Sequence, residues 1–174
     1  MIINPYRYKP PSGGEPYLLG AETLSCGSTS SIERRWFGLA LTVPTSGTLT
    51  KAEIAVSFSS YAGVIGFAVY DSAKSLVGSK AIDTDNDATV AVFDGLSIPV
   101  IGGQLYHFAT IAELTSGNGL VCYEESIFSP DNGLFSVLDA SAEPHSTVWA
   151  PPSSITGLDF TDSRQAVMRI TVTP

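Results

Sequence analysis

Hydrophobic and polar residues alternate with a period of two along much of the chain after residue 35. In segment 51–58 one side is apolar and the other is small or polar, and segment 166–173 repeats this pattern. Such alternation is typical of a half-buried strand, because successive side chains of a strand point to opposite faces. Segment 64–70 is apolar on both faces, which predicts a central strand. No long segment shows helical periodicity, so we expect no βαβ fold.

These patterns predict an all-β domain, a single antiparallel β-sandwich of the jelly-roll type. The predicted strands cover 36–43, 51–58, 64–70, 89–93, 96–100, 104–112, 119–124, 134–138 and 166–173. Asp94-Gly95 predicts a tight turn between two of them, and Pro99 predicts an edge strand or a bulge. We expect the core to contain Trp36, Ile54, Val56, Phe58, Phe67, Val69, Val90, Val92, Phe108, Met168 and Ile170.

The first 20 residues differ from the rest of the chain. Four prolines and the pair Gly13-Gly14 predict an extended N-terminal arm over residues 1–20, followed by the sandwich domain over residues 21–174. The arm carries Tyr6, Tyr8 and Tyr17, and such large apolar groups need a partner that buries them. Two alternatives stay open: the arm folds back onto its own domain, or it docks on a neighbouring subunit.

Charge and composition exclude several classes of function. Only 15% of the residues are charged, against about 25% in an average protein, and the net charge is -8. The chain has no basic stripe for nucleic acid or for an anionic membrane. Its N-terminus lacks the basic region and apolar core of a signal peptide. Without such export, we expect Cys26 and Cys122 to be free thiols, with Cys122 packed as a small hydrophobe.

The sequence contains no recognisable catalytic constellation, and we expect a protein without enzyme activity and without a cofactor. His107 alternates with aromatic residues, which predicts a surface or edge position, and no nucleophile or zinc motif accompanies it. Glu124-Glu125 are adjacent in a strand and face opposite sides, so the pair cannot flank a glycosidic bond. The rival hypothesis is a glycan-degrading enzyme whose carboxylates, such as Glu113 or Asp139, are brought together by folding.

The acidic run Asp83-Thr84-Asp85-Asn86-Asp87 is a candidate calcium site. Asp83, Asp85 and Asp87 alternate as in the opening of a Ca²⁺-binding loop, and Asp94 is the twelfth residue counted from Asp83. However, Ala88 stands where such a loop needs glycine, and no helices flank it. A turn rich in Asp and Asn explains the same residues without a metal.

Residues 125–164 are rich in turn signals and predict structured loops at one end of the sandwich. Trp149, beside Pro151-Pro152, and the nearby His145 are candidate contacts for a sugar ring, because aromatic faces stack on pyranose rings. A tryptophan is also a common core residue. The alternative function is therefore a carbohydrate-binding module or a receptor-binding tip that recognises cell-surface glycans.

The opening Met1-Ile2-Ile3-Asn4-Pro5-Tyr6-Arg7-Tyr8 resembles the start of structural proteins of tailed bacteriophages. Segment 36–112 is also similar to the β-sandwich modules of phage tail, fibre and capsid-decoration proteins. The resemblance implies a virion component that is made in the host cytoplasm without a signal peptide. It would assemble as a homo-oligomer or with major capsid or tail proteins. Terminal arms that lock neighbours together are common in such proteins, and here Tyr6, Tyr8 and Tyr17 would take that role.

Overall fold

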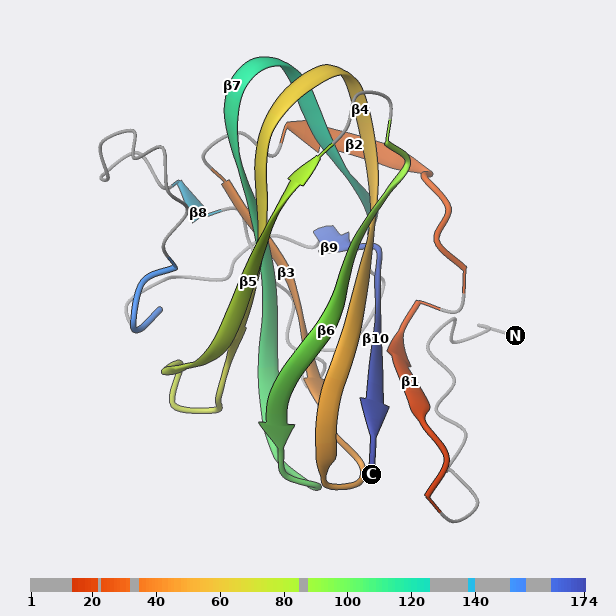
Figure 1. Cartoon of the computed structure of the whole chain (residues 1–174), viewed down its shortest axis with the longest axis vertical. Coiled ribbons are helices and arrows are strands. Elements are labelled where there is room, and N and C mark those ends of the chain that lie inside the picture. Colours follow the sequence, from red (N-terminus) through yellow and green to blue (C-terminus); the bar gives the residue numbers. More distant parts are fainter. Residues whose placement is uncertain are drawn as a thin grey trace.

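The computed structural model describes residues 14–21, 23–31, 35–84, 88–125, 138–139, 151–155 and 164–174 (Figure 1). These ranges contain strands and connections but no helix, which confirms the predicted all-β class. The strands are β1 (Tyr17–Gly20), β2 (Ser28–Ser31), β3 (Arg35–Thr42), β4 (Gly47–Tyr70), β5 (Leu76–Thr84), β6 (Val90–Val100), β7 (Leu105–Glu125), β8 (Leu138–Asp139), β9 (Arg164–Ala166) and β10 (Met168–Thr173).

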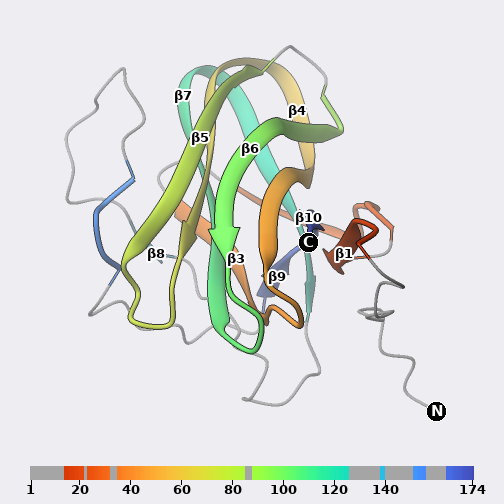
Figure 2. The same ribbon diagram turned by 60° about the horizontal axis from the view of Figure 1, so that its bottom comes forward.

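The strands form two antiparallel sheets of four strands each, which confirms the predicted sandwich. The first sheet, called sheet A here, has the order β1-β10-β4-β6 and uses the first half of β4. The second, sheet B, has the order β3-β7-β4-β5 and uses the second half of β4 and the first half of β7. At one flank β5 and β6 run side by side, and Figure 2 shows them closing the space between the sheets.

Strand β4 joins the two sheets without interruption. The sequence predicts separate strands at 51–58 and 64–70, but the structure has one strand of 24 residues. Residues up to Ala55 pair in sheet A, and residues from Val56 onward pair with β7. The register shifts between Ser59 and Gly63, where β4 and β7 arch over the end of the sandwich together (Figure 1). The polar and small residues at 59–63 therefore mark a bend in a continuous ribbon, which periodicity does not distinguish from a loop.

The tight turn predicted at Asp94-Gly95 is wrong, because both residues lie within strand β6. The chain continues straight through this pair, and Gly95, at φ 65°, makes a bulge opposite the irregularity between Leu49 and Lys51. The bulge shifts the alternation by one residue, so 91 and 93 are buried before it and 96, 98 and 100 after it. The prediction that Val90 and Val92 lie in the core is therefore wrong, and Ala91 and Phe93 are the buried residues instead. Among the described strands β6 pairs with β4 alone, which agrees with the edge position predicted from Pro99.

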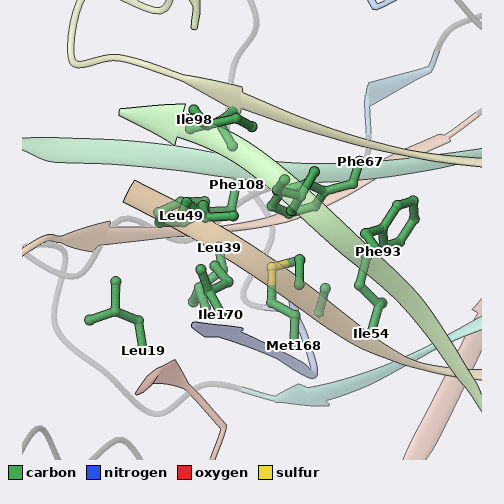
Figure 3. Packing of buried hydrophobic residues seen from close by; sticks show 14 of the residues in the cluster. Leu19, Leu39, Leu49, Ile54, Phe67, Phe93, Ile98, Phe108, Met168 and Ile170 are labelled. Atoms are coloured by element: carbon green, nitrogen blue, oxygen red, sulfur yellow. The ribbon is translucent and has the colours of Figure 1, made fainter. Parts of the chain in front are cut away.

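The core lies between the two sheets and is built from large side chains of both (Figure 3). Phe67 is its centre, with ring centroids 5.6 Å from Phe93 and 6.5 Å from Phe108. Offset or tilted aromatic pairs at such distances stabilise a core beyond their buried area. The described side chains confirm the predicted core residues Ile54, Val56, Phe58, Phe67, Val69, Phe108, Met168 and Ile170. The side chain of Trp36 lies outside the described residues.

The last part of the predicted arm belongs to the sandwich. Residues 17–20 form β1, an edge strand that pairs with β10 along sheet A. Tyr17 is 4% exposed, and its hydroxyl donates a hydrogen bond to the carbonyl oxygen of Thr45. The predicted docking role is therefore wrong for the Tyr17 side chain, because its apolar ring is used in the core of its own domain. Tyr6 and Tyr8 lie outside the described residues.

A disulfide joins Cys26 to Cys122, with 5.0 Å between the two Cα atoms. This corrects the expectation of free thiols. We expected free thiols because the sequence shows no signal for export to an oxidising compartment, and it gives no sign that the two residues meet. They meet because β2 pairs with the second half of β7, which places Thr29 opposite Cys122. The side of β7 that carries Cys122 therefore faces the connection between β1 and β2.

Two further segments border sheet B. Pro151–Ile155 lies along the connection between β4 and β5, where Ser154 forms an isolated bridge with Ser75 and Ile155 is buried. Of the predicted strand 134–138, only Leu138 is described, and it belongs to β8, opposite Trp36 in register. Over the described ranges, no helix is long and apolar enough to cross a membrane.

Candidate functional site

The two sheets differ in what covers their outer faces. On sheet B the outward positions near the centre are buried, and most are small: Gly38, Ala40, Ala68 and Ala109, together with Tyr70 and His107. Small residues let a covering chain approach the sheet closely. The central part of this face is therefore enclosed within the molecule, whereas Thr42, Ser79 and Asp83 toward its edges are exposed.

The outer face of sheet A is open. Apart from Ala55, every outward position described on its four strands is at least partly exposed. Its surface side chains, which we call the open face, are Leu18, Thr50, Lys51, Glu53, Val92, Asp94, Arg169, Thr171 and Thr173. Leu18 lies at the edge formed by β1 and is 51% exposed. Because its described strands present these side chains to solvent, this face is the candidate site.

Charged side chains at the middle of the open face hold one another in place. Arg169 Nε donates to Glu53 Oε2 at 2.9 Å, and Lys51 Nζ lies 3.2 Å from Glu53 Oε1 and 4.0 Å from Asp94 Oδ1. The hydrogen bond from Arg169 lowers the pKa of Glu53, although burial opposes it. The bond to Glu53 in turn raises the pKa of Arg169. Both shifts favour the charged forms, so Glu53 and Arg169 form an ion pair at neutral pH.

Register explains this network, which the sequence alone does not reveal. Glu53 lies directly opposite Arg169 on β10 and Val92 on β6, while Lys51 lies opposite Thr171 and Asp94. Alternation predicts that Glu53 and Arg169 both point outward from their strands. Alternation does not say which strands are neighbours. Glu53 and Arg169 meet because β10, the last strand of the chain, pairs with β4.

The predicted surface or edge position of His107 is wrong. It lies on β7, between β3 and β4, opposite Ala40 and Tyr70, and it is buried on the covered face of sheet B. Burial lowers the pKa of His107, helped by the charge of Lys74 and opposed by Asp71. Burial also raises the pKa of Tyr70. Both groups are therefore neutral at pH 7, and they lie at directly opposite positions of β4 and β7.

The calcium candidate is only partly described. Asp83 is exposed on β5, opposite Val64, whereas Asp85 and Asp87 lie outside the described residues. Within the described ranges, no group of three or more His, Cys, Asp or Glu side chains is arranged to hold a metal ion. Asp94, the twelfth residue of the candidate loop, belongs instead to the open face, where Lys51 is its charged neighbour.

The other candidate residues are not brought together by the described structure. Glu113 lies on β7 opposite Val64, and Asp139 lies on β8 opposite Arg35, so the two are not neighbours in register. Glu124 and Glu125 pair with β9 at the end of β7. His145 and Trp149, the candidate glycan contacts, lie outside the described residues.

Comparison with known proteins gives no match, either to a family model or to a curated protein sequence.

Proposed function

We propose that this chain is a non-enzymatic structural component of a phage virion, a capsid-decoration, tail or fibre protein. In this proposal it assembles through the open face of sheet A and the N-terminal residues that precede β1. The observation that carries the proposal is the contrast between the two sheets, since one outer face is enclosed and the other is exposed. The opening sequence MIINPYRY supplies the resemblance to phage structural proteins.

The charge distribution supports assembly through this face. The whole chain carries a net charge of -8, so copies repel one another at most orientations. The network of Lys51, Glu53, Arg169 and Asp94 has two positive and two negative groups, so the centre of the open face is locally neutral. Because Glu53 and Arg169 already satisfy one another, covering them removes less hydration than covering isolated charges.

The N-terminal segment supports the same face. Strand β1 forms the edge of sheet A, so the residues that precede it enter the domain beside Leu18. An exposed leucine at the edge of a polar face is a suitable apolar anchor for a partner, because interfaces bury a few apolar groups within a polar rim. The proposal therefore places the contacts of Tyr6 and Tyr8 on a neighbouring virion protein.

The test compares two exposed apolar residues on different surfaces. Leu18 lies on the open face, and Ile101, 55% exposed, lies in the turn between β6 and β7. Phage particles are assembled with Leu18→Asp, Ile101→Asp or the natural chain, and the copies in purified particles are counted by quantitative mass spectrometry. We expect incorporation to fall about tenfold or more for Leu18→Asp, since 1.4 kcal/mol already gives that factor. Ile101→Asp should incorporate normally.

Circular dichroism of each purified variant checks that the sandwich is folded. Normal incorporation of folded Leu18→Asp would contradict an assembly role for the open face. Equal loss of both variants would also contradict it, because the effect would then not depend on the surface that carries the charge.

A further inference from the structure

The disulfide anchors a segment whose described side chains are mostly small or polar and exposed. Residues 21–31, which we call the strap, run from the end of β1 through Cys26 to the end of β2, and Glu22 lies outside the described residues. Strand β2 has the sequence STSS, with no large apolar residue, and its partner among the described strands is β7. Hydroxyl side chains contribute little apolar burial. The strap therefore depends on contacts other than a hydrophobic face of β2.

Among the described residues, these contacts are centred on Cys122. Ala21 and Leu24 from the strap pack against Ala55, Cys122 and Val167 in a small cluster that is separate from the main core. The backbone N–H of Ala21 also donates to the carbonyl oxygen of Met168 at 2.8 Å. The main core cluster holds Tyr17 and Leu19 of β1 but none of the strap side chains that the structure describes. Loss of the strap would therefore leave β1 and the two sheets in place.

We infer that the strap is a redox-controlled element, closed when Cys26 and Cys122 are joined and open when both are thiols. In a reducing compartment the two thiols persist, and in an oxidising one the disulfide forms. The protein would thus be made with an open strap and would close it on exposure to an oxidant. This inference does not depend on the proposed function, because it follows from the strap contacts alone.

Oxidation by a small disulfide such as oxidised glutathione gives a balanced reaction. Cys26 is exposed even in the closed state, where Cys122 is fully buried. The Cys26 thiolate of the open strap therefore meets the small disulfide first, attacks it and releases one glutathione thiolate. The Cys122 thiolate then attacks Cys26 Sγ in the mixed disulfide and releases the second. Each cysteine loses one proton and one electron when the new S–S bond forms, and these two electrons reduce the glutathione disulfide to two thiols.

The same asymmetry protects the closed state. A reducing thiol reaches Cys26 Sγ from solvent, and the leaving group is then the sulfur of Cys122 inside an apolar cluster. A thiolate in apolar surroundings is poorly stabilised, and a poor leaving group slows the exchange. We therefore expect the strap to close readily and to reopen slowly.

Hydrogen exchange with mass spectrometry tests the inference on the full chain. The natural chain is measured after treatment with oxidised glutathione and after reduction with a phosphine. We expect amides in 23–31 and 120–123 to exchange about tenfold or more faster after reduction. Amides of β6 and β10 should stay protected. Cys26→Ser should behave like the reduced chain without any reductant, and alkylation mapping should find Cys26 and Cys122 joined only in the oxidised natural chain.

Several results would overturn the inference. Equal exchange of the strap in both states would show that the disulfide does not hold it. Loss of protection throughout both sheets after reduction, or failure of Cys26→Ser to fold, would show that the bond supports the whole domain. Absence of the linked peptide after oxidation would show that the two cysteines do not pair.

Discussion

Arg169 on β10 donates a hydrogen bond from Nε to Glu53 Oε2 on β4 at 2.9 Å, across directly opposite positions of sheet A. We expect Glu53→Gln to lower the free energy of unfolding at pH 7 by about 1 kcal/mol, the upper range for a surface ion pair. Urea denaturation measures the change. Asp94→Asn is the matched control, because Asp94 Oδ1 lies 4.0 Å from Lys51 Nζ and the Asp94 side chain is more exposed than that of Glu53. Its effect should be close to zero.

The same pair predicts an acid-side dependence of stability. Because the folded protein lowers the pKa of Glu53 below its ordinary value of 4.5, the stabilisation is complete above that value. It is lost as the pH falls through the lowered folded pKa. The difference between the natural chain and Glu53→Gln should therefore shrink below pH 4.5. A difference that stays constant down to strong acid would contradict the ionic contribution.

Gly20 predicts a large effect from a small substitution. It has φ +89°, and a Cβ atom there would lie 2.2 Å from the carbonyl oxygen of Met168, on the neighbouring strand. Gly20→Ala must displace β1 from β10, and we expect the free energy of unfolding to fall by about 2–4 kcal/mol. Gly14→Ala is the control, since Gly14 has φ +80° but nothing near the added atom. Equal thermal shifts in the two variants would contradict the close approach.

His107 predicts a second pH dependence, at higher pH. Burial lowers its folded pKa below the ordinary value of 6.5, so the unfolded chain binds a proton more readily. Above pH 6.5 His107 is neutral in both states and does not reduce the free energy of unfolding. This free energy falls as the pH drops from 6.5 toward the lowered folded pKa. We expect His107→Gln to remove this decline in urea denaturation between pH 7 and 5. A decline that persists unchanged in the variant would show that another group causes it.

The N-terminal segment yields a prediction that the described structure sharpens. Deletion of residues 1–13 leaves β1 and Tyr17 in place, so the sandwich should fold with unchanged circular dichroism. Particle incorporation should fall strongly, since Tyr6 and Tyr8 are then missing. Deletion of residues 1–20 is a poorer test, because it also removes β1 from sheet A. Normal incorporation of the shorter deletion would contradict the docking role of Tyr6 and Tyr8.

The sequence predicts the fold class and most of the core, because alternation depends on local geometry alone. It fails where a bulge shifts the alternation of buried and exposed positions by one residue. The bulge at Gly95 does so in β6, where Phe93 is buried instead of Val92. It also fails where distant strands meet. The burial of His107 and the pairing of Cys26 with Cys122 follow from the neighbours of β7, and periodicity within one strand carries no information about them.

The candidate site is predictable only in its parts. Outward positions such as Glu53 and Arg169 follow from alternation, but their pairing requires the register of β4 with β10. That one sheet face is open and the other enclosed also depends on how loops and edges pack after folding. The contrast between Ala68 and Lys51 hints at it, because small residues favour a covered face and charged residues an exposed one.

The most direct test of the structural role is the content of purified phage particles. Quantitative mass spectrometry of particles separated by density gradient gives the copies of this chain per particle. We predict that the chain copurifies in fixed stoichiometry, with hundreds of copies for a capsid-decoration protein or about a few dozen or fewer for a tail or fibre protein. Absence of the chain from intact particles, with the folded protein found only in the soluble lysate, would contradict the proposed function.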